Sequence, residues 1–309
     1  MRRDDLVILL AVALKPTGSG VFIPTNAYGA ELLTNGDFSA WTGGDPTGWT
    51  VVGESGSDPA ISESAPGGGA GNGAAKWNMT ATGTALQLRQ TVYNTGDYYE
   101  TAGSMTAYTS GRLDIVYGAT GGTPLPALSS ARAVRLLNRA ADPELRMQTG
   151  GATPRVWTID DFSVKKLTPS TQKTAASADM DVIALYTLPA SPVAGDSFWL
   201  VGRISSFSSG NYWLVYLDYT GTQWNVTLYS VASHTRTSQK SAANVGTTNA
   251  LRFYANGTTI RIYTSSNSGT NWTQRDTDLT SATYQTATDY NVLAGSQFTL
   301  GALSATVSV

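Results

Sequence analysis

The stretch Leu251-Arg-Phe-Tyr-Ala-Asn-Gly-Thr-Thr-Ile-Arg-Ile-Tyr263 carries the clearest structural signal in the chain. Apolar and polar side chains alternate on both sides of its central Asn-Gly pair. A period of two is typical of a strand with one buried face, and Asn-Gly favours the tight turn of a β-hairpin. The stretch therefore predicts two antiparallel strands that share one polar face, made of Arg252, Tyr254, Arg261 and Tyr263.

Segments of the same kind occur on both sides of this hairpin. Short alternating runs separated by Gly, Pro, Asn or Asp fill residues 31–167 and 179–309. Residues 168–178 are small and polar, which is typical of a linker. We therefore expect an all-β protein with two β-sandwich (jelly-roll) domains in tandem, at 31–167 and 179–309, after an N-terminal segment of residues 1–30.

The composition excludes several function classes. The 309 residues include 20 basic and 22 acidic side chains, a net charge of −2, whereas binding to nucleic acid needs a basic surplus. The absence of cysteine excludes disulfides and thiolate metal sites. The single histidine, His234, leaves little room for histidine-based metal sites, and its setting predicts an exposed hairpin tip.

The N-terminus has two interpretations. Its apolar run Leu6–Leu14 is too short to span a bilayer, which takes about 20 residues. It resembles the core of a secretory signal peptide, but Asp4 and Asp5 offset the basic start and no cleavage site follows closely. The alternative is an uncleaved arm buried against a partner chain, for which the anchoring candidates are Leu6, Val7, Ile8, Leu9 and Leu10.

Two motifs bracket the first domain. Leu32-Leu-Thr-Asn-Gly-Asp-Phe38 opens it, and Trp157-Thr-Ile-Asp-Asp-Phe-Ser-Val164 closes it. In this order they resemble the galactose-binding-like jelly-roll modules of carbohydrate-binding families. That resemblance implies that the first and last strands are neighbours and share a structural calcium.

The closing motif also predicts a β-bulge, because Ile159 and Phe162 both look core-facing although they are three positions apart. Calcium needs several oxygen ligands at one place, which makes Asp37, Asp160 and Asp161 the candidate ligands. The alternative is that these carboxylates only accept backbone N–H groups at strand ends. No cofactor is otherwise expected.

The second domain resembles concanavalin A-like or laminin G-like sandwiches. The resemblance rests on the long strands Phe198–Ile204, Tyr212–Tyr219 and Trp224–Tyr229, together with the hairpin at 251–263. Ser265-Ser-Asn-Ser-Gly-Thr-Asn-Trp272 is similar to the Asp-box turn of sialidases, so we expect a turn with Trp272 packed under it.

Some sandwiches of this second kind are glycoside hydrolases, which usually use a pair of carboxyl groups. The sequence has no glutamate after Glu144, and the aspartates of the second domain lie at strand ends or in turns. We therefore expect no enzyme activity.

Aromatic side chains that stack on sugar rings, with polar neighbours, are the expected means of ligand binding. The candidates for glycan binding are Trp41, Trp49, Tyr93, Tyr98, Arg89, Tyr229, Tyr254, Tyr263, Arg252 and Arg261. For the Tyr/Arg face of the second domain, a protein–protein interface and ordinary cross-strand pairing are alternatives.

Together these features resemble a tailed-bacteriophage virion surface protein. The resulting hypothesis is a non-enzymatic structural and adhesion protein at the virion surface. Its N-terminal arm contacts other virion proteins, its sandwich domains bind surface glycans, and it forms a homo-oligomer or part of a larger assembly. The alternatives are a secreted, extracellular bacterial carbohydrate-binding protein and an atypical glycoside hydrolase.

Overall fold

The computed structural model describes residues 24–65, 73–80, 84–117, 125–128, 130–140, 143–169 and 172–307. Within these ranges the chain forms strands, turns and bends, and the expectation of an all-β protein of packed sheets is confirmed. The described part contains no helix that is long and apolar enough to cross a membrane. The anchoring candidates Leu6–Leu10 lie outside the described residues.

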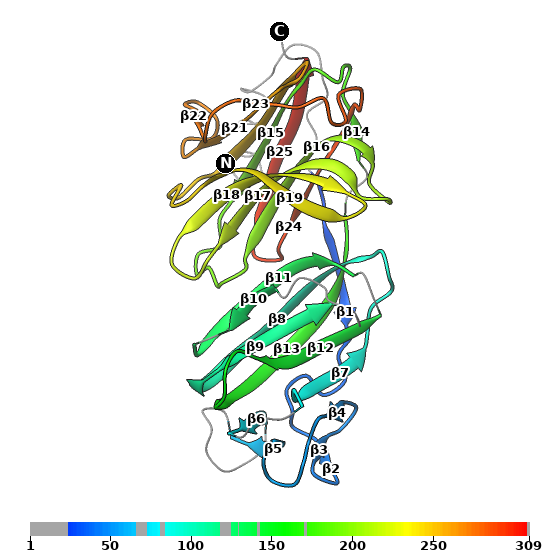
Figure 1. Ribbon diagram of the computed structural model, residues 1–309. Helices are drawn as coiled ribbons and strands as arrows, with labels where there is room; N and C mark the ends of the chain where they lie inside the picture. Colours follow the sequence, from blue (N-terminus) through cyan, green and yellow to red (C-terminus); the bar gives the residue numbers. More distant parts are fainter. Residues whose placement is uncertain are drawn as a thin grey trace, which may run out of the picture. The chain divides into compact units, whose positions relative to one another are not determined.

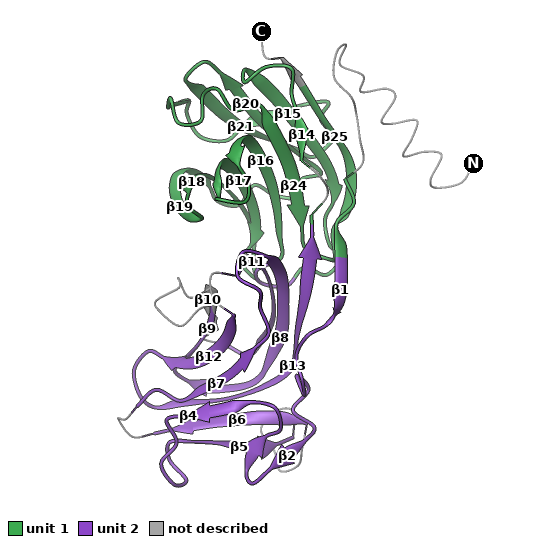
Figure 2. Cartoon of the chain, turned by 90° about the vertical axis from the view of Figure 1, so that its right-hand side faces the viewer, with its two compact units in different colours: residues 1–27, 169–192, 196–309 green, residues 28–168, 193–195 purple. Residues whose placement is uncertain are grey.

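The chain forms two compact units (Figure 2). We call the unit of Tyr28–Thr168, with Val193–Gly195, the N-terminal sandwich, and the unit that contains Pro169–Pro192 and Asp196–Val309 the C-terminal sandwich. The first begins slightly before the expected residue 31, because β1 (Ala27–Glu31) pairs with the strand that closes the domain.

Two antiparallel sheets build the N-terminal sandwich (Figure 1). One has the order β11 (Arg132–Arg139), β8 (Tyr98–Ser110), β13 (Arg155–Thr168), β6 (Ala74–Met79) and β5 (Ala60–Ser64), with β1 beside β13. The other has the order β10 (Leu125–Leu128), β9 (Arg112–Tyr117), β12 (Glu144–Gly150), β7 (Gln87–Thr91) and β4 (Thr50–Val52). A small separate hairpin consists of β2 (Trp41–Thr42) and β3 (Asp45–Pro46).

The C-terminal sandwich also has two antiparallel sheets. The first sheet has the order β14 (Lys173–Thr174), β24 (Asp289–Ala294), β16 (Ser197–Ser206), β17 (Asn211–Tyr219), β18 (Trp224–Ala232) and β19 (Thr235–Ala242). The second sheet has the order β22 (Thr273–Gln274), β21 (Thr259–Ser265), β20 (Ala250–Asn256), β15 (Met180–Thr187) and β25 (Thr299–Val307), with β23 (Leu279–Thr280) also beside β21.

The core of the C-terminal sandwich lies between these two sheets. Leu251, Phe253 and Ile262 of the second sheet are buried there with Leu200 and Val215 of the first. The sheets approach so closely that a Cβ on Gly202 would lie 2.4 Å from the Phe253 ring. The alternation read from the sequence therefore corresponds to an apolar face toward this core and a polar face away from it.

Two local features were expected from the sequence, a linker at residues 168–178 and a β-bulge near Asp160. The segment expected as a linker supplies β14, whose Lys173 pairs with Tyr290 of β24, so that part of it belongs to the C-terminal sandwich. The bulge in β13 is present: the register with β8 shifts between Asp160 and Ser163, and Asp161 has a φ of 53°.

Candidate ligand-binding face

The hairpin of β20 and β21 places arginine and tyrosine side chains in a checkerboard on the outer face of its sheet. Arg252 pairs with Tyr263, and Tyr254 pairs with Arg261 in the next row. Side chains that are directly opposite on antiparallel strands are close enough to interact. Each arginine therefore has one tyrosine across from it and the other two positions away on its own strand, and the two arginines are diagonal to each other.

Trp272 joins this cluster from the turn that follows β21. The guanidinium carbon of Arg252 lies 5.7 Å from the Trp272 ring centre, 5.0 Å from Tyr263 and 5.8 Å from Tyr254. Arg261 lies 5.4 Å from the Tyr254 ring. We call these residues, Arg252, Tyr254, Arg261, Tyr263 and Trp272, the arginine–aromatic face.

Each arginine of the face is held by an aspartate in two hydrogen bonds. Arg252 donates from Nε and Nη2 to the two carboxylate oxygens of Asp181 on β15, at 2.7 and 2.6 Å. Arg261 donates in the same way to Asp278, also at 2.7 and 2.6 Å. Such paired contacts fix the plane of each guanidinium. In Arg252 they use Nε and Nη2 and leave Nη1 outside the pair, whereas Arg261 also hydrogen-bonds Tyr263.

The ion pairs favour the charged forms of Arg252 and Asp278. Burial lowers the pKa of Arg252, but the hydrogen bonds and charge of Asp181 outweigh this and raise it overall. Hydrogen bonds from Arg261 and Gln274 hold the pKa of Asp278 below its usual value. Because two arginines face two aspartates, the arginine–aromatic face carries no net charge and offers little attraction to an anion.

The chemistry of the face is that of a shallow platform. Its three aromatic rings are half-buried, so that they are held in place but keep an accessible surface. Half-buried rings offer apolar contact area at a low cost in conformational entropy, and the Arg252 Nη1 group adds a donor fixed by the Asp181 pair. This combination suits a neutral ligand with both apolar faces and hydroxyl groups.

Sequence reasoning placed four of these residues together but missed their partners. Trp272 was expected to pack under its turn; it does lie against Gly269, where a Cβ would be 3.0 Å from the ring, but it also reaches Arg252. Asp181 and Asp278 had no signal of their own. For Asp181, the alternation along β15 would have placed it on the polar face.

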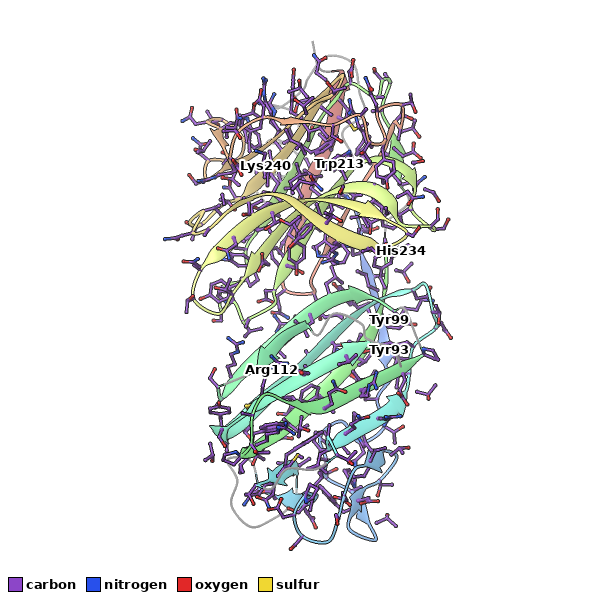
Figure 3. All side chains as sticks on the ribbon, in the orientation of Figure 1. Tyr93, Tyr99, Arg112, Trp213, His234 and Lys240 are labelled. Atoms are coloured by element: carbon purple, nitrogen blue, oxygen red, sulfur yellow. The ribbon has the colours of Figure 1, made fainter. Side chains whose placement is uncertain are left out.

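Tyr229 lies elsewhere. It belongs to β18 in the other sheet of the C-terminal sandwich, where its ring centre is 6.0 Å from that of Tyr216. His234 lies at the tip of the β18–β19 hairpin, as the sequence suggested, and is labelled in Figure 3. Its Nε2 is 3.0 Å from the Ser208 carbonyl oxygen, so the imidazole is not simply solvated.

The aromatic candidates of the N-terminal sandwich serve its core instead of a surface. Trp49 is 7% exposed and packs on Phe38, while Tyr98 is 6% exposed. Tyr93 is 3% exposed, and its ring centre is 4.8 Å from that of Tyr99 (Figure 3). Burial leaves these rings no open face for a sugar, which corrects that expectation.

Two further candidates in this unit are engaged in local contacts. Trp41 packs partly against the core and donates its indole N–H to the Phe38 carbonyl oxygen at 2.7 Å. Arg89 bonds Gln87 and forms an ion pair with Glu144 at 3.8 Å. Neither residue is part of a larger aromatic surface.

The three calcium candidates do lie near one another. Burial raises the pKa of Asp160, although the backbone N–H of Asp161 opposes this, and the charges of Asp161 and Asp37 raise it further. The carboxylate of Asp160 accepts the Asp161 N–H at 2.7 Å, and Asp37 accepts the Ser39 N–H at 3.3 Å. The described residues contain no group of three or more acidic or histidine side chains arranged to hold a metal ion.

Comparison with known proteins gives little further information. No family model matches the chain. No curated protein matches it either. A solved structure of a variant of the GH43 protein BlXynB from Bacillus licheniformis matches 75% of this chain, at 11% identity and a TM-score of 0.31. The match covers 61% of that protein, so this chain spans less than two thirds of its length.

This comparison corrects the function expected from the sequence. The expected virion structural and adhesion protein was wrong: the solved chain that matches is a GH43 protein, and nothing supports a virion, bacteriophage or adhesion role. At this low similarity the match assigns no activity to the present chain. The coarser conclusion, an all-β protein built from sandwiches, stands on the structure itself.

Proposed function

We propose that the C-terminal sandwich binds a neutral carbohydrate on the arginine–aromatic face. The observation that supports this most is the placement of three half-buried rings, Tyr254, Tyr263 and Trp272, around the charge-neutralised Arg252. The rings supply apolar contact for the faces of sugar rings. The Arg252 Nη1 group, held in position by Asp181, supplies a donor for hydroxyl oxygens.

The charge balance distinguishes this proposal from binding of an acidic polymer. Both arginines already have bidentate carboxylate partners, so an incoming anion would have to compete with Asp181 and Asp278. A neutral ligand uses the remaining donors without breaking either pair. The proposal includes two more specific similarities: that of the C-terminal sandwich to concanavalin A-like sandwiches, and that of residues 31–167 to galactose-binding-like modules.

Titration calorimetry with hexasaccharides of glucan, xylan, mannan and galactan tests the proposal on the full chain. We expect at least one of them to bind, and Tyr263→Ala to weaken that binding by about tenfold or more, equivalent to about 1.4 kcal/mol. Tyr229→Ala removes a half-buried tyrosine from the other sheet and should leave the affinity unchanged.

Two results would count against carbohydrate binding at this face. One is that no hexasaccharide binds while the protein self-associates and Tyr263→Ala abolishes that association, which would make the face a protein interface. The other is that an anionic hexasaccharide binds more tightly than every neutral one, because charge neutralisation of Arg252 and Arg261 predicts the opposite.

A further inference from the structure

A pocket with a volume of about 550 Å³ lies in the C-terminal sandwich beside the arginine–aromatic face. It is formed where β15 and β25 meet two turns, residues 247–249 and 266–268. None of its lining residues is an Asp, Glu, Lys, Arg or His. The pocket is therefore an uncharged site that the function proposed above does not yet use.

A β-bulge forms one wall of this pocket. Ala184 pairs with Leu303 and Tyr186 pairs with Leu300, so that two residues of β25, Gly301 and Ala302, lie opposite a single residue of β15. The strands approach closely at this point, because a Cβ on Gly301 would lie 2.9 Å from the Leu185 Cβ. Glycine here maintains the shape of the wall.

The two turns that form the rim are fixed to each other. Asn249 accepts the backbone N–H of Ser268 at 2.7 Å and donates its amide to the Ser268 hydroxyl at 3.3 Å. Deeper in the pocket, the hydroxyl groups of Tyr186 and Thr248 are 2.5 Å apart. The pocket is thus largely preformed, which lowers the entropic cost of binding a ligand.

The lining combines apolar surface with hydroxyl groups that have no protein partner. Leu185, Leu188 and Leu300 supply apolar side chains. Among the described residues, the exposed lining hydroxyls that make no hydrogen bond are those of Thr187, Thr247, Ser266 and Thr299. Such a lining matches a neutral ring that has an apolar face and several hydroxyls at its edge.

The pocket continues the arginine–aromatic face along the strands. Arg252 pairs with Ile183 and Tyr263, and two residues further along β20, Ala250 pairs with Leu185 and Ser265. Leu185 lines the pocket, and the turn that follows Ser265 supplies both the pocket rim and Trp272. Two residues of a strand span about 7 Å, so a ligand can touch both regions at once.

We propose that this pocket receives the terminal residue of a neutral saccharide whose adjoining residues lie on the arginine–aromatic face, an inference that rests on the carbohydrate binding proposed above. The bulge and the two turns form the walls of the pocket, and its lining residue Leu185 lies two positions along β15 from Ile183, the partner of Arg252. With the terminal residue held in the pocket, the protein recognises chain ends and prefers short saccharides to the interior of long ones.

The test uses the full chain and whichever neutral hexasaccharide binds it. Thr299→Trp fills the pocket from an exposed position, and we expect it to weaken hexasaccharide binding by at least tenfold. The parent polysaccharide, compared at equal concentration of sugar residues, should compete at least tenfold less well because its chain ends are dilute. Thr237→Trp, at an exposed position on β19, is the matched control and should bind as the unchanged protein does.

The possible outcomes distinguish end recognition in the pocket from carbohydrate binding on the arginine–aromatic face. If Tyr263→Ala abolishes binding while Thr299→Trp, with an unchanged thermal midpoint, binds normally, the face binds sugar and the pocket does not. Equal competition by polysaccharide and hexasaccharide would also overturn end recognition. If no neutral hexasaccharide binds the unchanged protein, both proposals fail together.

Discussion

Asp218, near the end of β17, shows how the position of a single carboxyl group changes its chemistry. It pairs in register with Ser197 on one side and Asn225 on the other, and its carboxylate accepts no hydrogen bond among the described residues. Burial raises its pKa to about 6, and the positive charge of Arg236 only partly opposes this. The sequence placed this residue at a strand end without indicating that it would be buried.

The stability of the C-terminal sandwich should consequently depend on the charge of Asp218. Because the folded-state pKa lies above that of the unfolded chain, near 3.9, the folded protein loses stability as pH rises from about 4 to 6. Asp218→Asn removes this loss and should stabilise the fold at pH 7 by an amount on the order of 2 kcal/mol.

Denaturant unfolding at a series of pH values measures this effect. The difference between Asp218→Asn and the unchanged protein should be small near pH 4 and reach its full size above pH 6. Asp45→Asn, in the β2–β3 hairpin of the other sandwich, is the control for a generic effect of removing one negative charge. A difference independent of pH would show that the carboxyl is not perturbed by burial.

At the scale of elements, Arg203 connects the two sheets of the C-terminal sandwich. It lies in a register irregularity of β16, with a φ of 46°, and its side chain is buried. Its guanidinium donates to the carbonyl oxygens of Ala178 and Gly257 at 2.9 and 2.8 Å. Asp179, 3.3 Å from the same guanidinium, also accepts the Gly257 N–H at 2.7 Å.

This contact holds the β20–β21 turn against the neighbouring sheet, so its loss should be costly. Arg203→Met leaves the carbonyl groups of Ala178 and Gly257 without this donor and Asp179 without its ion-pair partner, and we expect it to lower the free energy of unfolding by about 3 kcal/mol. Arg261→Met, in the more exposed pair with Asp278, should cost clearly less, because solvent screens an exposed ion pair. Equal losses in chemical denaturation would contradict the bridging role of Arg203.

At the scale of the whole molecule, each sandwich has its own core. The buried cluster of the C-terminal sandwich draws only on residues from Ala175 to Ala305. The cluster of the N-terminal sandwich runs from Leu33 to Val164 and also includes Ala194, from a loop that lies later in the sequence. The N-terminal sandwich therefore needs a residue from a later loop to complete its core, whereas the core of the C-terminal sandwich does not draw on the sequence before Ala175.

A chain limited to residues 169–309 should accordingly fold by itself. It retains the whole buried cluster and all strand pairs of its two sheets, so we expect a β-type circular dichroism spectrum and one cooperative thermal transition. Residues 28–168 lack Ala194 and should be the less stable fragment. An unfolded 169–309 fragment would show that its core depends on the other unit.

Much of this architecture was predictable because its signals are local. The alternation of Leu251 and Phe253 with Arg252 and Tyr254 fixed both the strand and its polar face, and the pair of core-facing residues around Asp160–Asp161 indicated the bulge. Alternation of apolar and polar residues with a period of two indicates which side of a strand is buried, and an Asn-Gly pair indicates where the chain turns.

The binding face and its neighbours depended on contacts that no local pattern encodes. Arg252 and Asp181 are 71 positions apart, and only the pairing of β15 with β20 brings them together. The same holds for the pocket at Gly301, where β25 meets β15. Trp49 and Tyr93 are buried because they join the core cluster of the N-terminal sandwich. The sequence alone thus determined the strands and their two faces, whereas sheet order and register, which arise from long-range packing, decided which side chains meet.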